Sequence, residues 1–142
     1  MSKDHDTTSI LTERQLEVLR LRGKGLSQRE IADILGTTRS NVSILESRAA
    51  QNVERARRTI DEWMTIQAPI VVTVAGGSDI FQIPGLIFQE ADSQNLRLPM
   101  DSVELVVQLR TKAPQELKGR MILRDIQIFV SREGEMLVKP LP

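Results

Sequence analysis

The chain has 142 residues with 19 basic and 19 acidic side chains, so its net charge at pH 7 is zero. Non-specific nucleic-acid binding depends on basic surface. Because the net charge is zero, any basic surface must be confined to one part of the protein. The absence of cysteine excludes disulfides, thiolate nucleophiles and zinc fingers. No apolar run approaches the roughly 18 residues of a membrane span, and "MSKDHDTTS" lacks the apolar segment of a secretion signal. We therefore expect a cytoplasmic protein with no membrane partner.

The first predicted helix begins after Thr12. Thr12 and Gln15 form a capping box, in which two side chains satisfy backbone N–H groups that the helix start leaves free. Apolar residues then recur at helical spacing, which predicts one buried face. Gly23 and Gly25 end this helix.

The second predicted helix is short. It begins with another capping box, formed by Ser27 and Glu30, and Gly36 ends it in the left-handed conformation that costs glycine least. Thr38 is the expected cap of a third helix, in which apolar residues recur every three or four positions as far as Pro69. At 1.5 Å per residue, about 28 helical residues would span roughly 40 Å.

The spacing of small and apolar residues around Gly36 predicts that the second and third helices cross. A large side chain at the crossing would push them apart, and Ala32 supplies a small one. Gly36 supplies the positive φ angle of the turn, while Val42 and Leu45 lie three apart on the inner face of the third helix. These features predict a helix-turn-helix motif; the alternative is a three-helix bundle with no binding role.

After the third helix the composition becomes that of a mixed α and β domain. The β-branched run at 70–74 predicts a strand, and the patterns at 83–95 and 100–113 predict two helices. Residues 125–131 and 136–140 predict an antiparallel hairpin closed by "REGE".

The sequence therefore predicts an α+β protein with two domains. Residues 1–68 would form an all-α helix-turn-helix domain extended by a long helix. Residues 69–142 would form a small α+β domain of one strand, two helices and an antiparallel hairpin. Phe81, Phe88 and Phe129 are expected in a core, because aromatic side chains usually pack there.

In a helix-turn-helix the second helix of the pair enters the major groove of DNA, and its N-terminal residues reach base edges. Here that helix begins near Arg39, and positions facing away from Val42 would be exposed. Arginine suits guanine, asparagine suits adenine, serine suits bases or phosphates, and isoleucine suits a thymine methyl group. The predicted DNA-binding residues of this helix are Thr38, Arg39, Ser40, Asn41, Ser43, Ile44, Ser47 and Arg48.

The preceding helix opens with residues that would contact backbone phosphates, namely Ser27, Gln28 and Arg29. Glu46 departs from a purely basic reading helix. It either accepts a hydrogen bond from cytosine or pairs with a neighbouring side chain.

Arg55, Arg57 and Arg58 lie further along the third helix. Either they contact phosphates or they form a solvated helix face, and the sequence leaves both interpretations open. Residues 39–58 hold five arginines and two glutamates, so this segment carries a local charge of +3.

The stretch "LTERQLEVLRLRGKGLSQREIADILGTTRSNVSIL" resembles the helix-turn-helix of LuxR-type regulators and of sigma-factor region four. Together with "VVTVAGGSDIFQIPGLIFQEAD", "VELVVQLRTKA" and "REGEMLVKP", it resembles the Tfx family of archaeal DNA-binding proteins over nearly the whole chain. The resemblance implies a transcription regulator whose N-terminal region binds double-stranded DNA. It does not imply which genes are controlled.

Alternatives stay open in both halves. The N-terminal module would either bind DNA specifically or contact RNA polymerase, as the similarity to sigma region four implies. The second domain would either form a homodimer, so that two modules bind half-sites about 34 Å apart, or sense a small-molecule effector. Gly76, Gly77 and Ser78 would then offer backbone N–H groups to an anion, although a plain turn is favoured.

Catalysis is not expected. An enzyme needs a positioned acid, base, nucleophile or metal. The chain has no cysteine or tyrosine, and its one histidine, His5, lies in the polar N-terminal stretch. Motifs such as GxSxG and HExxH are missing. The sequence predicts no cofactor and no metal site.

Overall fold

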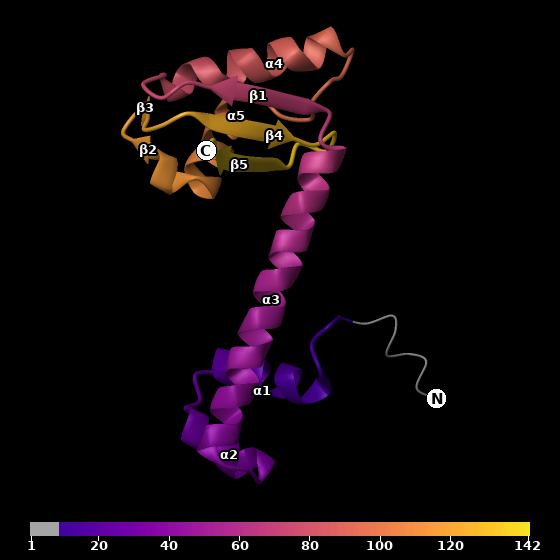
Figure 1. The fold of residues 1–142 in the computed structure, drawn as a ribbon, viewed down its shortest axis with the longest axis vertical. Coiled ribbons are helices and arrows are strands. Elements are labelled where there is room, and N and C mark those ends of the chain that lie inside the picture. The colour runs from indigo at the N-terminus through magenta and orange to yellow at the C-terminus, as the bar shows by residue number, and fades with distance from the viewer. Residues whose placement is uncertain (1–8) are drawn as a thin grey trace. The chain divides into compact units, whose positions relative to one another are not determined.

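The computed structural model describes residues 9–142, and its first part contains the three predicted helices (Figure 1). Helix α1 spans Glu13–Gly23, α2 spans Gln28–Leu35 and α3 spans Arg39–Gln67. With 29 residues, α3 has the predicted length. The α+β fold class is confirmed, because the strands follow these helices in the second part of the chain.

The chain forms two compact units that divide between Ile60 and Asp61. This division falls inside α3, whereas the composition of the sequence changes only where α3 ends. Each unit has its own buried core.

The helix ends of the first unit follow from the predicted capping boxes. The hydroxyl of Thr12 accepts a hydrogen bond from the N–H of Gln15, and that of Ser27 accepts one from the N–H of Glu30, each at 3.1 Å. The side chains of Gln15 and Glu30 accept in return from the N–H groups of the two cap residues. Gly36 ends α2 with a φ of 68°, the left-handed region that favours glycine.

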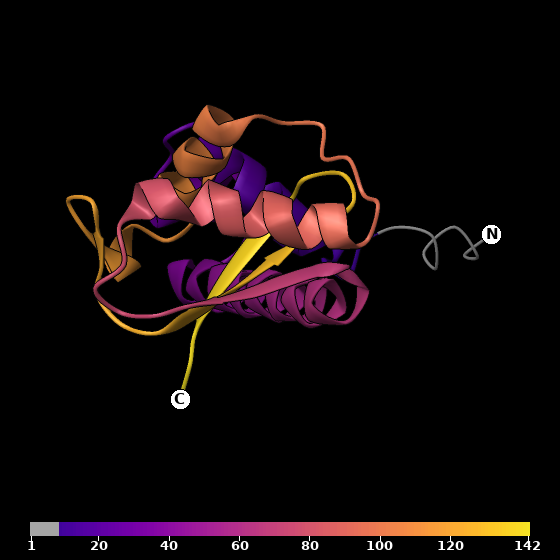
Figure 2. The ribbon, with the colours of Figure 1, turned by 90° about the horizontal axis from the view of Figure 1, so that it is seen from above.

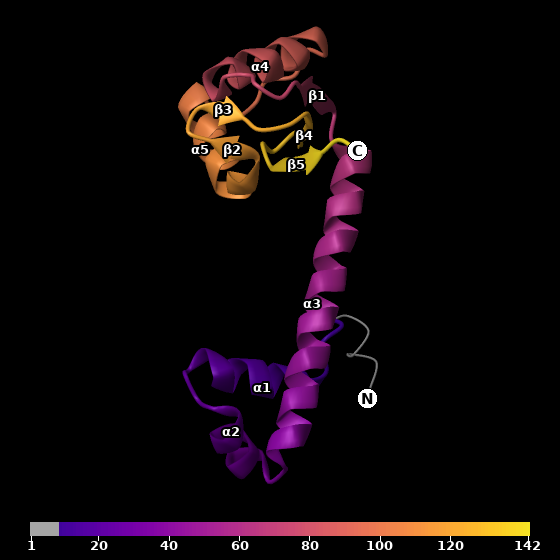
Figure 3. The same cartoon turned by 60° about the vertical axis from the view of Figure 1, so that its left-hand side comes forward.

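The core of the first unit confirms that α2 and α3 pack against each other. Val18, Ile31, Ala32 and Val42 form one buried cluster, in which Ala32 keeps only 4% of its accessible surface. Figure 3 shows α1 and α2 on the same side of α3. Because this packing uses the inner side of α3, the opposite side stays exposed among the described residues of the first unit.

The second unit contains the predicted strand, two helices and hairpin. Their bounds are β1 Ile70–Val74, α4 Ile83–Ser93, α5 Ser102–Lys112, β4 Ile126–Val130 and β5 Met136–Pro140. Four shorter elements were not predicted, because two or three residues carry no periodicity. They are 3-10 helices at Ile80–Gln82 and Pro114–Glu116, and the paired strands β2 (Leu117–Lys118) and β3 (Met121–Ile122).

Strands β1, β4 and β5 form one antiparallel sheet in the order β1-β4-β5. In its register Val72 pairs with Ile128, which pairs with Val138. Successive strand residues point to opposite faces, and this row joins Leu105 and Leu109 of α5 in the core. Helices α4 and α5 thus cover one face of the sheet (Figure 2).

The three phenylalanines differ in burial. Phe129 is buried, and Phe88 is half-buried against the core. Phe81 is 55% exposed, so the prediction that it lies in the core is wrong. It belongs to the unpredicted 3-10 helix before α4.

The turn after β1 uses its own N–H groups. The N–H of Gly76 donates to Asp125 Oδ1 at 2.8 Å, and the N–H of Gly77 donates to the carbonyl of Ile122 at 2.7 Å. The N–H of Ser78 is bonded to the carbonyl three residues before it. The interpretation as a plain turn is confirmed, and an anion would find these donors occupied.

Candidate nucleic-acid interface

The start of α3 is capped and exposed. The hydroxyl of Thr38 accepts a hydrogen bond from the N–H of Asn41 at 3.1 Å, which confirms Thr38 as the cap. The Asn41 side chain donates to the hydroxyl of Thr37 at 2.9 Å. Arg39 and Ser40 follow on the surface. A helix start leaves backbone N–H groups without helical partners and carries the positive end of the dipole, so it favours an anion such as phosphate.

The first three turns of α3 present a continuous exposed side, here called the outer face. At about 100° per residue, its positions point away from Val42, which is fully buried. Ile44 keeps 48% of its accessible surface. This is a large exposed fraction for an isoleucine, so the core of the first unit does not use this side chain. The outer face comprises Ser40, Asn41, Ser43, Ile44, Ser47 and Arg48, of which Ser43 is half-buried and the others exposed.

A chain of hydrogen bonds joins the start of α3 to α1 and α2. The carboxylate of Glu46 accepts from Arg22 Nε at 3.0 Å and from Gln28 Nε2 at 2.8 Å. The Oε1 atom of Gln28 accepts in turn from Arg39 Nη1 at 2.9 Å. Glu46 therefore pairs with neighbours, as one of the two interpretations predicted. The Oε1 atom and one of the two Nε2 hydrogens of Gln28 are used, so a phosphate contact by Gln28 relies on its second Nε2 hydrogen.

The negative charge of Glu46 is stabilised by its two donors. The hydrogen bond from Gln28, and then that from Arg22, lower the pKa of Glu46 below its ordinary value of 4.5, against the opposing effect of partial burial. The carboxylate is ionised at neutral pH. Because the charge of Arg22 balances it, Glu46 opposes an approaching phosphate less than a free carboxylate would.

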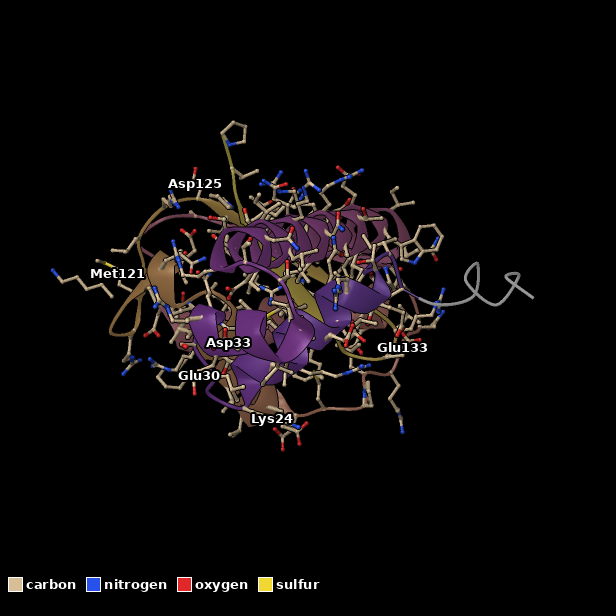
Figure 4. The ribbon with its side chains drawn as sticks, turned by 90° about the horizontal axis from the view of Figure 1, so that it is seen from below. Lys24, Glu30, Asp33, Met121, Asp125 and Glu133 are labelled. Carbon is tan, nitrogen blue, oxygen red and sulfur yellow. The ribbon has the colours of Figure 1, made fainter. Side chains whose placement is uncertain are left out.

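The exposed side of α2 carries charges of both signs. The hydroxyl of Ser27 serves as the cap of α2, and Arg29 is exposed beside two exposed acids, Glu30 and Asp33. Figure 4 shows Glu30 and Asp33 on the outer side of α2. Bonds from the backbone and hydroxyl of Ser27 lower the pKa of Glu30. Since these acids offset Arg29, the start of α3 offers a more favourable surface for phosphate than α2 does.

The three arginines further along α3 have different surroundings. Arg58 Nε lies 3.4 Å from the carboxylate of Glu54, so its charge is partly balanced. Arg55 and Arg57 are exposed, and no ion pair within residues 9–142 involves either of them. Arg57 follows Arg39 by five full helical turns and lies on the same side of α3.

Other kinds of site find no support in the described part of the chain. It contains no group of three or more His, Cys, Asp or Glu side chains that could hold a metal ion. His5 lies outside the described residues. Among the helices of residues 9–142, none combines the length and apolar character that crossing a membrane requires.

Comparison with known proteins matches both parts of the chain. Residues 9–55 match the family described as "Sigma-70, region 4", and residues 56–138 match "DNA_binding protein, TFX, C-term". A "putative transcriptional regulatory protein" of Thermococcus kodakarensis is 45% identical over 130 residues, which cover 92% of this chain and 85% of that protein.

Two relatives named "DNA-binding protein Tfx" come from Methanothermobacter thermautotrophicus and Methanothermobacter marburgensis. Each is 35% identical over 130 residues, which cover 92% of this chain and 94% of the relative.

Proposed function

We propose that this chain, which belongs to the Tfx family of DNA-binding transcription regulators, recognises a specific DNA sequence by placing the start of α3 in the major groove. The observation that carries the proposal is the outer face of α3. It follows a capped, exposed helix start and lies opposite the side that α1 and α2 bury. An α-helix fits the major groove. In helix-turn-helix modules the N-terminal residues of the second helix read the bases, and the segment from Thr38 to Arg48 contains these positions.

The outer face of α3 and the arginines before and after it each have a chemical role in this proposal. The free N–H groups at the start of α3 hold a phosphate. Arg39 donates two hydrogen bonds to guanine, and Asn41 bonds to adenine. Ile44 packs on a thymine methyl group, while Arg48, Arg55 and Arg57 approach phosphates. Residues such as Ser40, Ser43 and Ser47 bond to base edges or to the DNA backbone.

The experiment that tests this proposal is selection of bound DNA from a random pool, followed by methylation interference on the selected sequence. Methylation of guanine N7 modifies the major groove, whereas methylation of adenine N3 modifies the minor groove. We expect one enriched sequence and loss of binding on guanine N7 methylation. No enrichment, or interference at adenine N3 alone, would contradict the proposal.

A second candidate is a module that contacts RNA polymerase, and the match of residues 9–55 to sigma-70 region 4 favours it. A gel shift with a promoter fragment and unlabelled competitor separates the two candidates. Sequence-specific retardation by the purified chain alone supports the regulator. Retardation that requires added polymerase supports the polymerase-binding module.

We also propose that the protein acts as a homodimer in the cytoplasm, where two chains would bind paired half-sites. The free edge of β1 supports self-association: it is an outer strand, and its sequence "IVVTV" has no charge or proline of the kind that protects sheet edges. A symmetric selected sequence and a sedimentation mass of two chains are expected. A single unrepeated site bound by a monomer would contradict the dimer.

A further inference from the structure

A hollow of about 260 Å³ lies within the second unit, between the start of α4 and α5. Its lining includes Phe81, Pro84, Val103, Val106, Val107 and Arg110. Pro84 and Val106 are buried, so the hollow reaches the core. Ligand pockets have volumes of about 300–1,000 Å³, so this hollow lies just below that range and would hold only a small molecule.

The apolar lining is left exposed to solvent. Phe81, Val103 and Val107 keep 55%, 69% and 56% of their accessible surface. The core does not need these side chains, because Leu105 and Leu109 bury the other side of α5. Covering these side chains would stabilise the protein, because apolar surface would be removed from water. Helix α5 therefore has two apolar sides, and one of them faces the hollow.

Gly85 lines the hollow and has no side chain to occupy it. It lies in the first turn of α4, where a β-carbon would meet no other atom within 4 Å. Its backbone is not among those with positive φ. Glycine in a helix loses more conformational entropy on folding than alanine does, so it lowers stability. Neither packing nor backbone conformation requires this glycine, whereas a site that needs the space explains it.

One cation lines the hollow without a carboxylate partner. Nη1 of Arg110 donates to the carbonyl of Gly119 at 3.3 Å, and no ion pair of the described residues includes Arg110. Arg120 is engaged, because it pairs with Asp79 and its Cζ atom lies 4.7 Å from the centroid of the Phe81 ring. The guanidinium of Arg110 presents paired N–H donors that match the two oxygens of a carboxylate.

We infer that this hollow binds a small amphipathic carboxylate. Its short acyl or aryl body packs on Phe81, Val103 and Val107, and its carboxylate accepts hydrogen bonds from Arg110. The apolar walls supply most of the affinity, and the positive charge of Arg110 selects ligands whose polar end is negative. An ammonium at that end is repelled by Arg110. The inference concerns a binding site inside the second unit and goes beyond the proposed recognition of DNA.

The test is an NMR titration of the full chain, labelled at its valine methyl groups, with octanoate below its micelle concentration. We expect saturable shifts at Val103 and Val107 and none at Val18 in the first unit. Octylammonium, which has the same chain and the opposite charge, is expected to bind at least tenfold more weakly.

Two variants and one control assign the binding to this hollow. Gly85→Leu fills the empty space and is expected to weaken octanoate binding at least tenfold without lowering the melting temperature. Arg110→Gln is expected to weaken octanoate binding at least tenfold and to remove the preference over octylammonium. Arg132→Gln, at another exposed arginine of the second unit, is expected to leave binding unchanged.

Three results would each overturn the inference: no saturable octanoate binding, equal affinity for octylammonium, or unchanged octanoate binding in Gly85→Leu and Arg110→Gln. No DNA enters the titration. Failure of this site and failure of DNA recognition are therefore separate results.

Discussion

At the scale of single residues, Arg39 is the side chain on which base recognition depends most in the proposed complex. In the free protein its Nη1 atom is held 2.9 Å from Oε1 of Gln28. Gln28 is half-buried and is itself held by Glu46. Because this chain of bonds restricts Arg39 before DNA arrives, less conformational entropy is lost on binding.

Arg39→Ala is expected to weaken binding to the selected sequence by about 1–3 kcal/mol and to relax the preference at one base pair. The reason is loss of a two-pronged hydrogen bond to guanine. Competition binding against single-base variants of the site measures both effects. The matched control is Arg29→Ala on α2, which should not change base preference. Equal weakening on all sequences would mean that Arg39 contacts phosphate only.

Glu46→Gln tests the link between α1, α2 and α3. The folded pKa of Glu46 is lowered, so its charge stabilises the protein above the ordinary value of 4.5, and this stabilisation is lost as pH falls through the lower folded pKa. At about pH 7 the variant should be less stable by about 1 kcal/mol, because a bond to a charged group is weakened. Hydrogen exchange of buried Val18 and Ile31 reports this loss.

The difference between wild type and Glu46→Gln should disappear at acid pH, where Glu46 becomes neutral in both the folded and the unfolded chain. Glu17→Gln is the control, since Glu17 lies 3.9 Å from Arg14 in an exposed pair that contributes little. A difference that persists unchanged at about pH 3 would show that the Glu46 charge does not contribute.

The sequence predicts local contacts of the site better than distant ones. The caps at Ser27 and Thr38 were predicted because the bonded groups lie three residues apart. The bond between Arg22 and Glu46 joins residues 24 positions apart, and no local pattern marks it. Gly76 shows the same limit: a β-carbon there would lie 2.9 Å from the Cα of Arg124, a contact set by the sheet.

At the scale of elements, α3 carries both the outer face and a line of arginines. Arg57→Gln is expected to flatten the plot of log affinity against log salt by about one unit, because one phosphate contact is lost. Arg58→Gln is the matched control, since Arg58 already pairs with Glu54. Titrations at several salt concentrations measure the slope. An unchanged slope for Arg57→Gln would assign that arginine to a solvated helix face.

Elements with strong end signals were predicted closely, and short elements were missed. Residues 70–74 are predicted as a strand and match β1, and the side chain of Asp101 caps α5 by accepting a hydrogen bond from the N–H of Glu104. The strands β2 and β3 have two residues each, so only their pairing defines them. Phe81 was misplaced because an aromatic ring was expected to seek the core. Here the guanidinium of Arg120 stacks on the ring instead.

At the scale of the whole molecule, the two units differ in the size of their cores. The buried cluster of the first unit has four residues, including Val18 and Val42, whereas that of the second has 17. The sequence predicts the fold class because each half has its own periodicity. The boundary between the two units lies inside α3, where the amino-acid composition does not change. The boundary depends on which side chains pack together, so the sequence does not predict it.

The first unit is therefore expected to open at a lower free energy than the second. Hydrogen exchange should show weaker protection at Val18 and Ile31 than at Leu109 and Ile128. Adding the selected DNA at about 100 times its dissociation constant should raise the free energy of opening of the first unit by up to about 2.7 kcal/mol. The reason is that the DNA binds only the folded state. Val18→Ala should lower protection in the first unit alone. If both cores instead share one opening free energy and shift together, the chain unfolds as a single cooperative unit and core size does not set the order.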